Sequence, residues 1–89
     1  MEKLYNKAFS LGAQDFGISN KKNKRFYVLY NNIYIHFGSS VGNTYIDHKD
    51  KNKQKAWFAR HSKIKNNKGQ SVIKLKSSPL YWSANILWI

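Results

Sequence analysis

The chain has 89 residues, no cysteine and only four acidic residues. Without cysteine it forms no disulfide and no thiolate metal site. Its apolar runs fall short of the ~18 residues of a membrane span. The N-terminal stretch, with Glu2 and scattered lysines, does not have the pattern of a secretory signal peptide. We therefore expect a protein that is neither secreted nor bound to a membrane.

The four acids are Glu2, Asp15, Asp47 and Asp50, against 16 Lys and Arg, and the net charge is +12. After Asp50 the sequence has no acid at all. A soluble surface ordinarily mixes charges of both signs, whereas a surface of one sign is typical of proteins that bind phosphates. This composition predicts a polyanionic partner. A solvated basic face in a protein rich in Lys and Asn is the simpler alternative.

Catalytic motifs are also missing: the sequence has no glycine-rich phosphate loop, no nucleophile elbow and no HExxH. His48 and His61 are thirteen residues apart, which is about 20 Å along a helix and too far for one metal ion. A nuclease built from His36, Asp47 and His61 is conceivable, but helix capping explains Asp47 as simply. We expect no enzyme activity, no catalytic residue, no cofactor and no metal.

Aromatic residues make up 16% of the chain, enough rings to build a small core. The length predicts a single domain over residues 1–89. The clearest pattern is a β-hairpin in which two runs, 26–30 and 33–37, flank Asn31 and Asn32. A two-residue turn there puts the following residues on one face, which we expect to be the core face: Phe26, Val28, Tyr30, Ile33, Ile35 and Phe37.

Three further elements follow from local signals. Residues 2–11 have helical spacing of apolar residues, with Gly12 beyond the end. Asp47 is placed to cap a helix over about 48–61, and Ser78 with Pro79 to start a short helix over about 79–88. Residues 71–76 alternate weakly, as in an edge strand. The fold class expected is α+β: an antiparallel hairpin or meander sheet of three or more strands, packed by the central helix through Trp57 and Phe58 and by the C-terminal helix.

The second face of the hairpin carries Tyr27 opposite His36 and Leu29 opposite Tyr34. Two interpretations of these aromatic residues are open. They could form a platform on which unpaired bases stack. Alternatively, Trp82 and Trp88 could cover Tyr27 and Tyr34, and because aromatic residues in small domains are so often buried, the sequence favours this second interpretation.

The cations predict how a nucleic acid would be contacted. Lys meets phosphate as a point charge, whereas Arg is the usual bidentate reader of guanine. With fourteen Lys and two Arg, the chain has the chemistry for backbone contact and little for base readout. The predicted nucleic-acid-binding residues lie in two loops and on one helix surface: Lys21, Lys22, Lys24, Arg25, Lys51, Lys53, Lys55, Arg60, Lys63, Lys65 and Lys68.

Three segments, taken in their order along the chain, carry a family resemblance. They are residues 24–28 with Ile35-His36-Phe37-Gly38, residues 45–50 with Ala59-Arg60-His61, and Ser78-Pro79 through Tyr81-Trp82-Ser83 to Leu87-Trp88. Together they make residues 24–88 similar to an uncharacterised family of small basic proteins encoded by large double-stranded DNA viruses, including giant viruses of protists, and by some phages. Residues 1–20 lie outside the resemblance.

This resemblance implies viral origin and assigns no residue a role. Members of that family often carry a longer charged insert after the His-Phe-Gly segment, and here only a few residues separate Gly38 from Tyr45. The leading hypothesis is a small viral protein that binds DNA or RNA through phosphate contacts. The alternatives are a minor capsid or cement protein that contacts acidic coat surfaces, or an inhibitor of a host nucleic-acid enzyme. Either way, we expect it in the virion or in the cytoplasm or nucleus of the infected cell.

Overall fold

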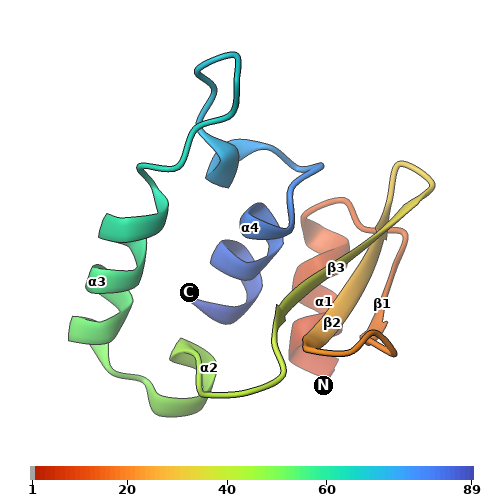
Figure 1. The fold of residues 1–89 in the computed structure, drawn as a ribbon. Coiled ribbons are helices and arrows are strands. Elements are labelled where there is room, and N and C mark those ends of the chain that lie inside the picture. Colours follow the sequence, from red (N-terminus) through yellow and green to blue (C-terminus); the bar gives the residue numbers. More distant parts are fainter. Residues whose placement is uncertain (1) are drawn as a thin grey trace. The chain divides into compact units, whose positions relative to one another are not determined.

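The computed structural model describes residues 2–89 and has an α+β fold (Figure 1). The chain divides into two compact units, the first ending at Gly42 and the second running over Asn43–Ile89. The α+β class with a three-stranded antiparallel sheet confirms the prediction from the sequence. Within residues 2–89, no helix has both the length and the apolar character needed to cross a membrane.

The first unit consists of one helix and one meander sheet. Helix α1 (Glu2–Ser10) is followed by strands β1 (Asp15–Ile18), β2 (Lys24–Tyr30) and β3 (Ile33–Ser39), which lie side by side in that order. The helix ends one residue before the predicted end. Gly12 follows it with φ 104°, a left-handed conformation that terminates helices and favours glycine.

The β2–β3 hairpin has the predicted register. Phe26 pairs with Phe37, Val28 with Ile35, and Tyr30 with Ile33. Asn31 and Asn32 both adopt positive φ, 52° and 62°, as the tight turn that matches strand twist requires. The backbone N–H of Asn32 also donates to Oε1 of Gln14 at 2.8 Å, which ties the turn to the start of the sheet.

The core of this unit is a cluster of rings on one face of the sheet. Phe16 of β1 packs against Phe26 with ring centroids 5.2 Å apart, and Phe26 packs against Phe37 at 6.2 Å. Helix α1 covers this face, with the ring of Tyr5 set edge-on to Phe16 at 6.4 Å. The predicted core is wrong at the turn end, because Ile33 is 60% exposed. Ile33 adjoins the turn, where the face of the sheet ends.

The second unit begins with two helices where the sequence predicted one. Helix α2 (Tyr45–His48) precedes α3 (Lys51–His61), and between them Lys49 has φ 56°. That left-handed residue breaks the helix, so the predicted start near residue 48 is wrong by three residues. The side chain of Asp50, not of Asp47, caps α3: its Oδ1 accepts the N–H groups of Asn52 and Lys53 at 2.9 and 3.2 Å.

The C-terminal part of the unit contains three short helical elements. They are the 3₁₀ helix η1 (Val72–Lys74), helix α4 (Pro79–Trp82) and the π-helical turn η2 (Ser83–Leu87). The predicted strand over 71–76 is wrong, because turn bonds from Lys74 N–H to the Ser71 carbonyl and from Leu75 N–H to the Val72 carbonyl curl this segment. The predicted start at Ser78 and Pro79 is confirmed, with Ser78 Oγ accepting from Leu80 N–H at 3.1 Å.

Two aromatic groups organise the core of the second unit. Trp82 is fully buried, as are Ile86 and Leu87 of η2. Trp57, predicted to face inward from α3, is buried and stacks on Trp88 with ring centroids 5.0 Å apart. Trp57 also stacks on His61, with ring centroids 4.2 Å apart. The inward face of α3 is therefore occupied by the C-terminal segment of the same unit.

The two aspartates of this unit should both matter for stability. Asp50→Ala removes two cap bonds from the eleven-residue α3, and Asp47→Ala removes the Oδ2 acceptor for Thr44 N–H at 2.8 Å. We expect each variant to lose about 1 kcal/mol of unfolding free energy, the usual scale for a lost cap. Urea denaturation followed by circular dichroism measures the change. An Asp50→Ala variant as stable as the wild type would contradict the assignment of this cap.

Candidate nucleic-acid interface

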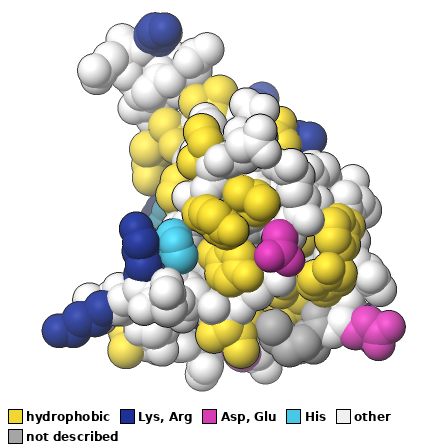
Figure 2. Space-filling model, turned by 90° about the vertical axis from the view of Figure 1, so that its right-hand side faces the viewer, with side chains coloured by type: hydrophobic (Ala, Val, Ile, Leu, Met, Phe, Trp, Pro, Cys, Tyr) yellow, Lys and Arg dark blue, Asp and Glu magenta, His cyan; other side chains and the backbone are white. Residues whose placement is uncertain are grey.

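The outer face of the sheet presents aromatic side chains. Strand alternation places Tyr27 of β2 and Tyr34 and His36 of β3 on the face opposite the phenylalanine core. Tyr34 is 60% exposed, and Tyr27 and His36 are half-buried. Figure 2 shows hydrophobic side chains gathered on one face of the molecule, with a histidine and Lys or Arg side chains at their border.

The favoured expectation that Trp82 and Trp88 cover these tyrosines is wrong. Trp82 is buried in its own unit, where its Nε1–H donates to the carbonyl of Lys76 at 2.7 Å. Trp88 is engaged in the stack on Trp57. The exposure of Tyr34 therefore leaves the alternative of an accessible aromatic platform.

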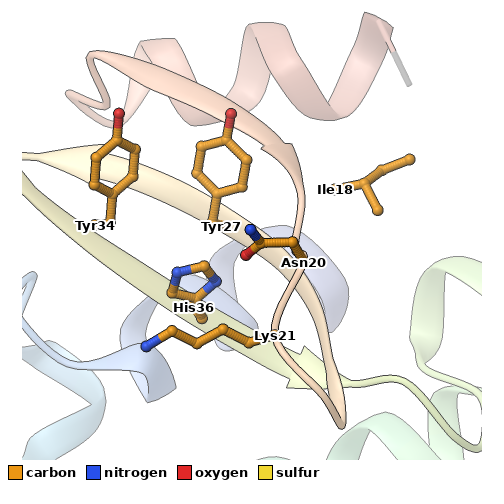
Figure 3. Close-up of a pocket in the computed structure, with 6 residues that line it drawn as sticks. All are labelled: Ile18, Asn20, Lys21, Tyr27, Tyr34 and His36. Atoms are coloured by element: carbon orange, nitrogen blue, oxygen red, sulfur yellow. The ribbon is translucent and has the colours of Figure 1, made fainter.

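A hollow of about 540 Å³ lies on this outer face (Figure 3). The rings of Tyr34 and Tyr27 stand side by side on neighbouring strands, and His36 follows Tyr34 along β3. Asn20 and Lys21 reach the hollow from the loop between β1 and β2, and Ile18, which is 70% exposed, also lines it. The volume lies within the roughly 300–1,000 Å³ typical of pockets for small ligands.

Gly17 and Asp15 of β1 hold the ring of Tyr27 in place. A Cβ atom at residue 17 would lie 2.7–2.9 Å from the end of the Tyr27 ring, so only glycine lets the ring lie across β1. The Tyr27 hydroxyl donates to Oδ2 of Asp15 at 3.3 Å. Burial, with the negative charge of Asp15 second, raises the pKa of Tyr27, and the phenol stays protonated in neutral solution.

The imidazole of His36 lines the hollow, and nearby positive charges affect its pKa. Its Nδ1 lies 2.7 Å from Ser19 Oγ, and its ring centroid lies 5.9 Å from that of Tyr27. Burial, followed by the positive charges of Lys21 and Lys24, lowers the pKa of His36. The ring is therefore neutral at neutral pH, and the same two lysines create a positive potential that attracts anions.

The lowered pKa of His36 predicts a pH dependence of stability. The unfolded chain, with an ordinary pKa near 6.5, takes up the proton before the folded chain does as the pH falls. The unfolding free energy should therefore fall as pH drops below that value towards the lowered pKa, and His36 should contribute no slope above it. Midpoints of urea denaturation, measured between about pH 8 and pH 5, test this expected fall in stability. His36→Gln should show a flatter profile, and an unchanged profile would contradict the shift.

The predicted cations of the first unit lie at one end of the sheet. Lys21 and Lys22 are exposed in the loop before β2, and Lys24 is exposed at the first position of the strand. Arg25 is half-buried, with its guanidinium carbon 5.1 Å from the centroid of the Phe26 ring. The structure therefore brings Lys21 to the hollow, leaves Lys22 and Lys24 exposed nearby without lining it, and places the guanidinium of Arg25 against the Phe26 ring.

The predicted cations of the second unit separate into groups. Lys53 and Arg60, seven residues apart on one side of α3, line the same hollow of about 300 Å³ with Asn43, His48, Ala56 and Trp88. Lys51 and Lys55 are exposed on the other side of the helix. Lys63, Lys65 and Lys68 are exposed in the loop after α3 and do not line this hollow.

The acids and histidines form no cluster suited to a metal. Among residues 2–89, no group of three or more His, Cys, Asp or Glu side chains could hold a metal ion. Asp47 and Asp50 accept backbone N–H groups at helix starts. Nδ1 of His48 accepts the N–H of Asp50 at 2.9 Å, and its ring lies 5.5 Å from that of Trp88.

Several residues of the site were not singled out from the sequence. Gly17, Ser19 and Asn20 belong to β1 and the loop after it, where only the alternation of Phe16 and Ile18 signals a strand. Trp88 lines the hollow beside Lys53 and Arg60, although its position in an apolar tail predicts only burial.

Comparison with known proteins places the chain in a family. No curated protein and no solved structure matches it. A family model matches residues 14–61, a range that contains the sheet, the loop between β1 and β2 with Lys21 and Lys22, and all of α3. Because this match covers more than half of the 89 residues, the chain belongs to the family of unknown function DUF5754.

Proposed function

We propose that this protein binds nucleic acid through phosphate contacts, without catalysis and with little sequence preference. The observation that carries the proposal is the hollow on α3, which Lys53 and Arg60 line together with Trp88. Two cations that line one hollow can contact the same phosphate group, and the exposed cations elsewhere on the chain can each contact a further phosphate.

The balance of charges supports the same function. The second unit carries ten Lys and Arg but only Asp47 and Asp50. Both carboxylates accept backbone N–H bonds at helix starts. The cations of this unit therefore far outnumber its carboxylates, and an external polyanion is the partner that balances them.

A salt titration tests the proposal. Fluorescence anisotropy with labelled DNA and RNA should show binding that weakens steeply as salt is raised. If about five or six phosphates are contacted, the slope of log K against log salt on duplex DNA should be near −5. Scrambled sequences of equal length should bind about equally, since Lys-rich contacts carry little sequence information.

One outcome overturns the proposal. If neither DNA nor RNA binds at ~50 mM salt, where phosphate contacts are strongest, the cations do not serve nucleic acid. An acidic protein surface, such as that of a coat protein in a viral particle, then becomes the better partner. Copy number in purified particles would test that alternative.

A further inference from the structure

We propose that the hollow on the outer face of the sheet binds an unpaired base, so that single-stranded nucleic acid is the preferred partner. This inference rests on the proposed function and adds the class of nucleic acid and the residues that select it. The hollow belongs to the first unit, and the Lys53–Arg60 hollow to the second, so each can be altered without the other.

The rings are presented as a stacking surface needs. Tyr34 is 60% exposed, and its ring centroid lies 5.6 Å from that of Tyr27 at an angle of 62°. Gly17 and Asp15 fix Tyr27, so the second ring supports the first. A base that stacks on an exposed tyrosine replaces water on both apolar surfaces, and this contact is tolerant of sequence because every base has a π-face.

The border of the hollow supplies the polar contacts of a nucleotide. Lys21 provides an ammonium group for the phosphate, and the amide of Asn20 offers both donors and an acceptor for a base edge. His36 is neutral, because burial and, after it, the charges of Lys21 and Lys24 lower its pKa, so its ring can stack without carrying charge. An anion bound there offsets the two lysines and should raise the pKa of His36.

A duplex cannot use these groups in the same way. Its bases are paired and stacked on each other, so it presents base edges and phosphates but no base faces. Only an unpaired or flipped-out base can lie on the ring of Tyr34. The aromatic hollow therefore favours a single strand, while the cations elsewhere contact phosphates of either form.

The test compares one labelled oligonucleotide of about 20 nucleotides with the matching duplex, a length above the site size of small single-strand binders. Wild type should bind the single strand more tightly. Tyr34→Ser should weaken single-strand binding about 5- to 150-fold and leave duplex binding unchanged. Tyr34→Phe keeps the ring and should bind the single strand about as tightly as wild type.

Ile33→Ser is the matched control. Ile33 is the neighbouring residue, is also 60% exposed, and points to the opposite face of the sheet. Its replacement should leave both affinities unchanged. As a second readout, adenosine monophosphate should shift the NMR signals of Tyr34 and His36 and raise the pKa of His36.

The outcomes separate this inference from the proposed function. If wild type binds single strand and duplex equally and Tyr34→Ser changes neither, nucleic-acid binding stands and the base site is refuted. If wild type binds neither, the proposed function fails first. If Ile33→Ser loses as much single-strand affinity as Tyr34→Ser, general loss of apolar surface explains the effect and the base site is also refuted.

Discussion

Trp82→Ala should nearly unfold the second unit. The side chain is fully buried, and its Nε1–H donates to the carbonyl of Lys76 at 2.7 Å. Truncating such a side chain leaves a cavity and removes this hydrogen bond, and we expect a loss of about 3–5 kcal/mol. Small domains have only about 5–15 kcal/mol of stability in total, so the variant should sit close to its unfolding midpoint. Urea denaturation of wild type and variant gives the difference.

Trp82→Phe serves as the control for this experiment. It keeps most of the apolar volume and removes the hydrogen bond, so it should lose clearly less than Trp82→Ala. Tyr34→Ser, at an exposed position, should stay within about 0.5 kcal/mol of wild type. A loss under about 1 kcal/mol in Trp82→Ala would show that this ring does not hold the unit together.

The same experiment tests whether the chain unfolds as a single domain. All three tryptophans, Trp57, Trp82 and Trp88, lie in the second unit, so tryptophan fluorescence reports on that unit alone. The NMR signal of His36 reports on the first unit. Coincident midpoints by the two probes would support the single cooperative domain expected from the length. A Trp82→Ala variant that keeps a folded sheet would show that the units are independent.

The parts of the fold that were predictable have strong local causes. Asn31 and Asn32 fix the turn, because both tolerate positive φ, and the turn then fixes the register of β2 and β3. Ser78 and Pro79 start α4 for an equally local reason. The side chain of Ser78 caps the helix, and Pro79 has no backbone N–H that would need a partner. At these places, chemistry within a few residues is sufficient.

The predictions that failed, or were not made, concern segments whose structure depends on contacts with residues distant in the sequence. Strand β1 has four residues and forms through its pairing with β2, with Phe16 opposite Val28, so its own sequence gives little signal. The segment 71–76 has β-branched residues. At its start Ser71 bridges to Lys65 and the N–H of Val72 donates to the carbonyl of Ile64 at 3.1 Å, but turn bonds then curl the segment. The break at Lys49 was missed because a lysine in a left-handed conformation has no sequence signature.

The candidate site was predictable in its residue types and not in its geometry. The hairpin pattern placed Tyr27, Tyr34 and His36 on one face, but the 60% exposure of Tyr34 is a property of the folded chain that the pattern does not carry. The cations were predictable as exposed, and the helical wheel separates Lys51 and Lys55 from Lys53 and Arg60. That the latter two share a hollow depends on Trp88, which is distant in sequence.

Removing that convergent pair should have the largest effect on binding. The double variant Lys53→Gln and Arg60→Gln removes both cations that line the 300 Å³ hollow. Each lost phosphate contact makes the slope of log K against log salt less negative by about one unit. We therefore expect a change of about two units, with a loss of affinity on the order of tenfold to a hundredfold at ~0.1 M salt. Anisotropy titrations at several salt concentrations measure both.

The double variant Lys51→Gln and Lys55→Gln is the matched control. It removes the same net charge from the same helix, on the side away from the hollow. The salt slope counts the counterions released by cations that touch phosphate, whereas a change in net charge acts at long range and is screened within about 10 Å at 0.1 M salt. The control should therefore change the slope by less than the Lys53 and Arg60 double variant does. Equal effects of the two double variants would mean that overall charge, and not the hollow beside Trp88, holds the phosphates.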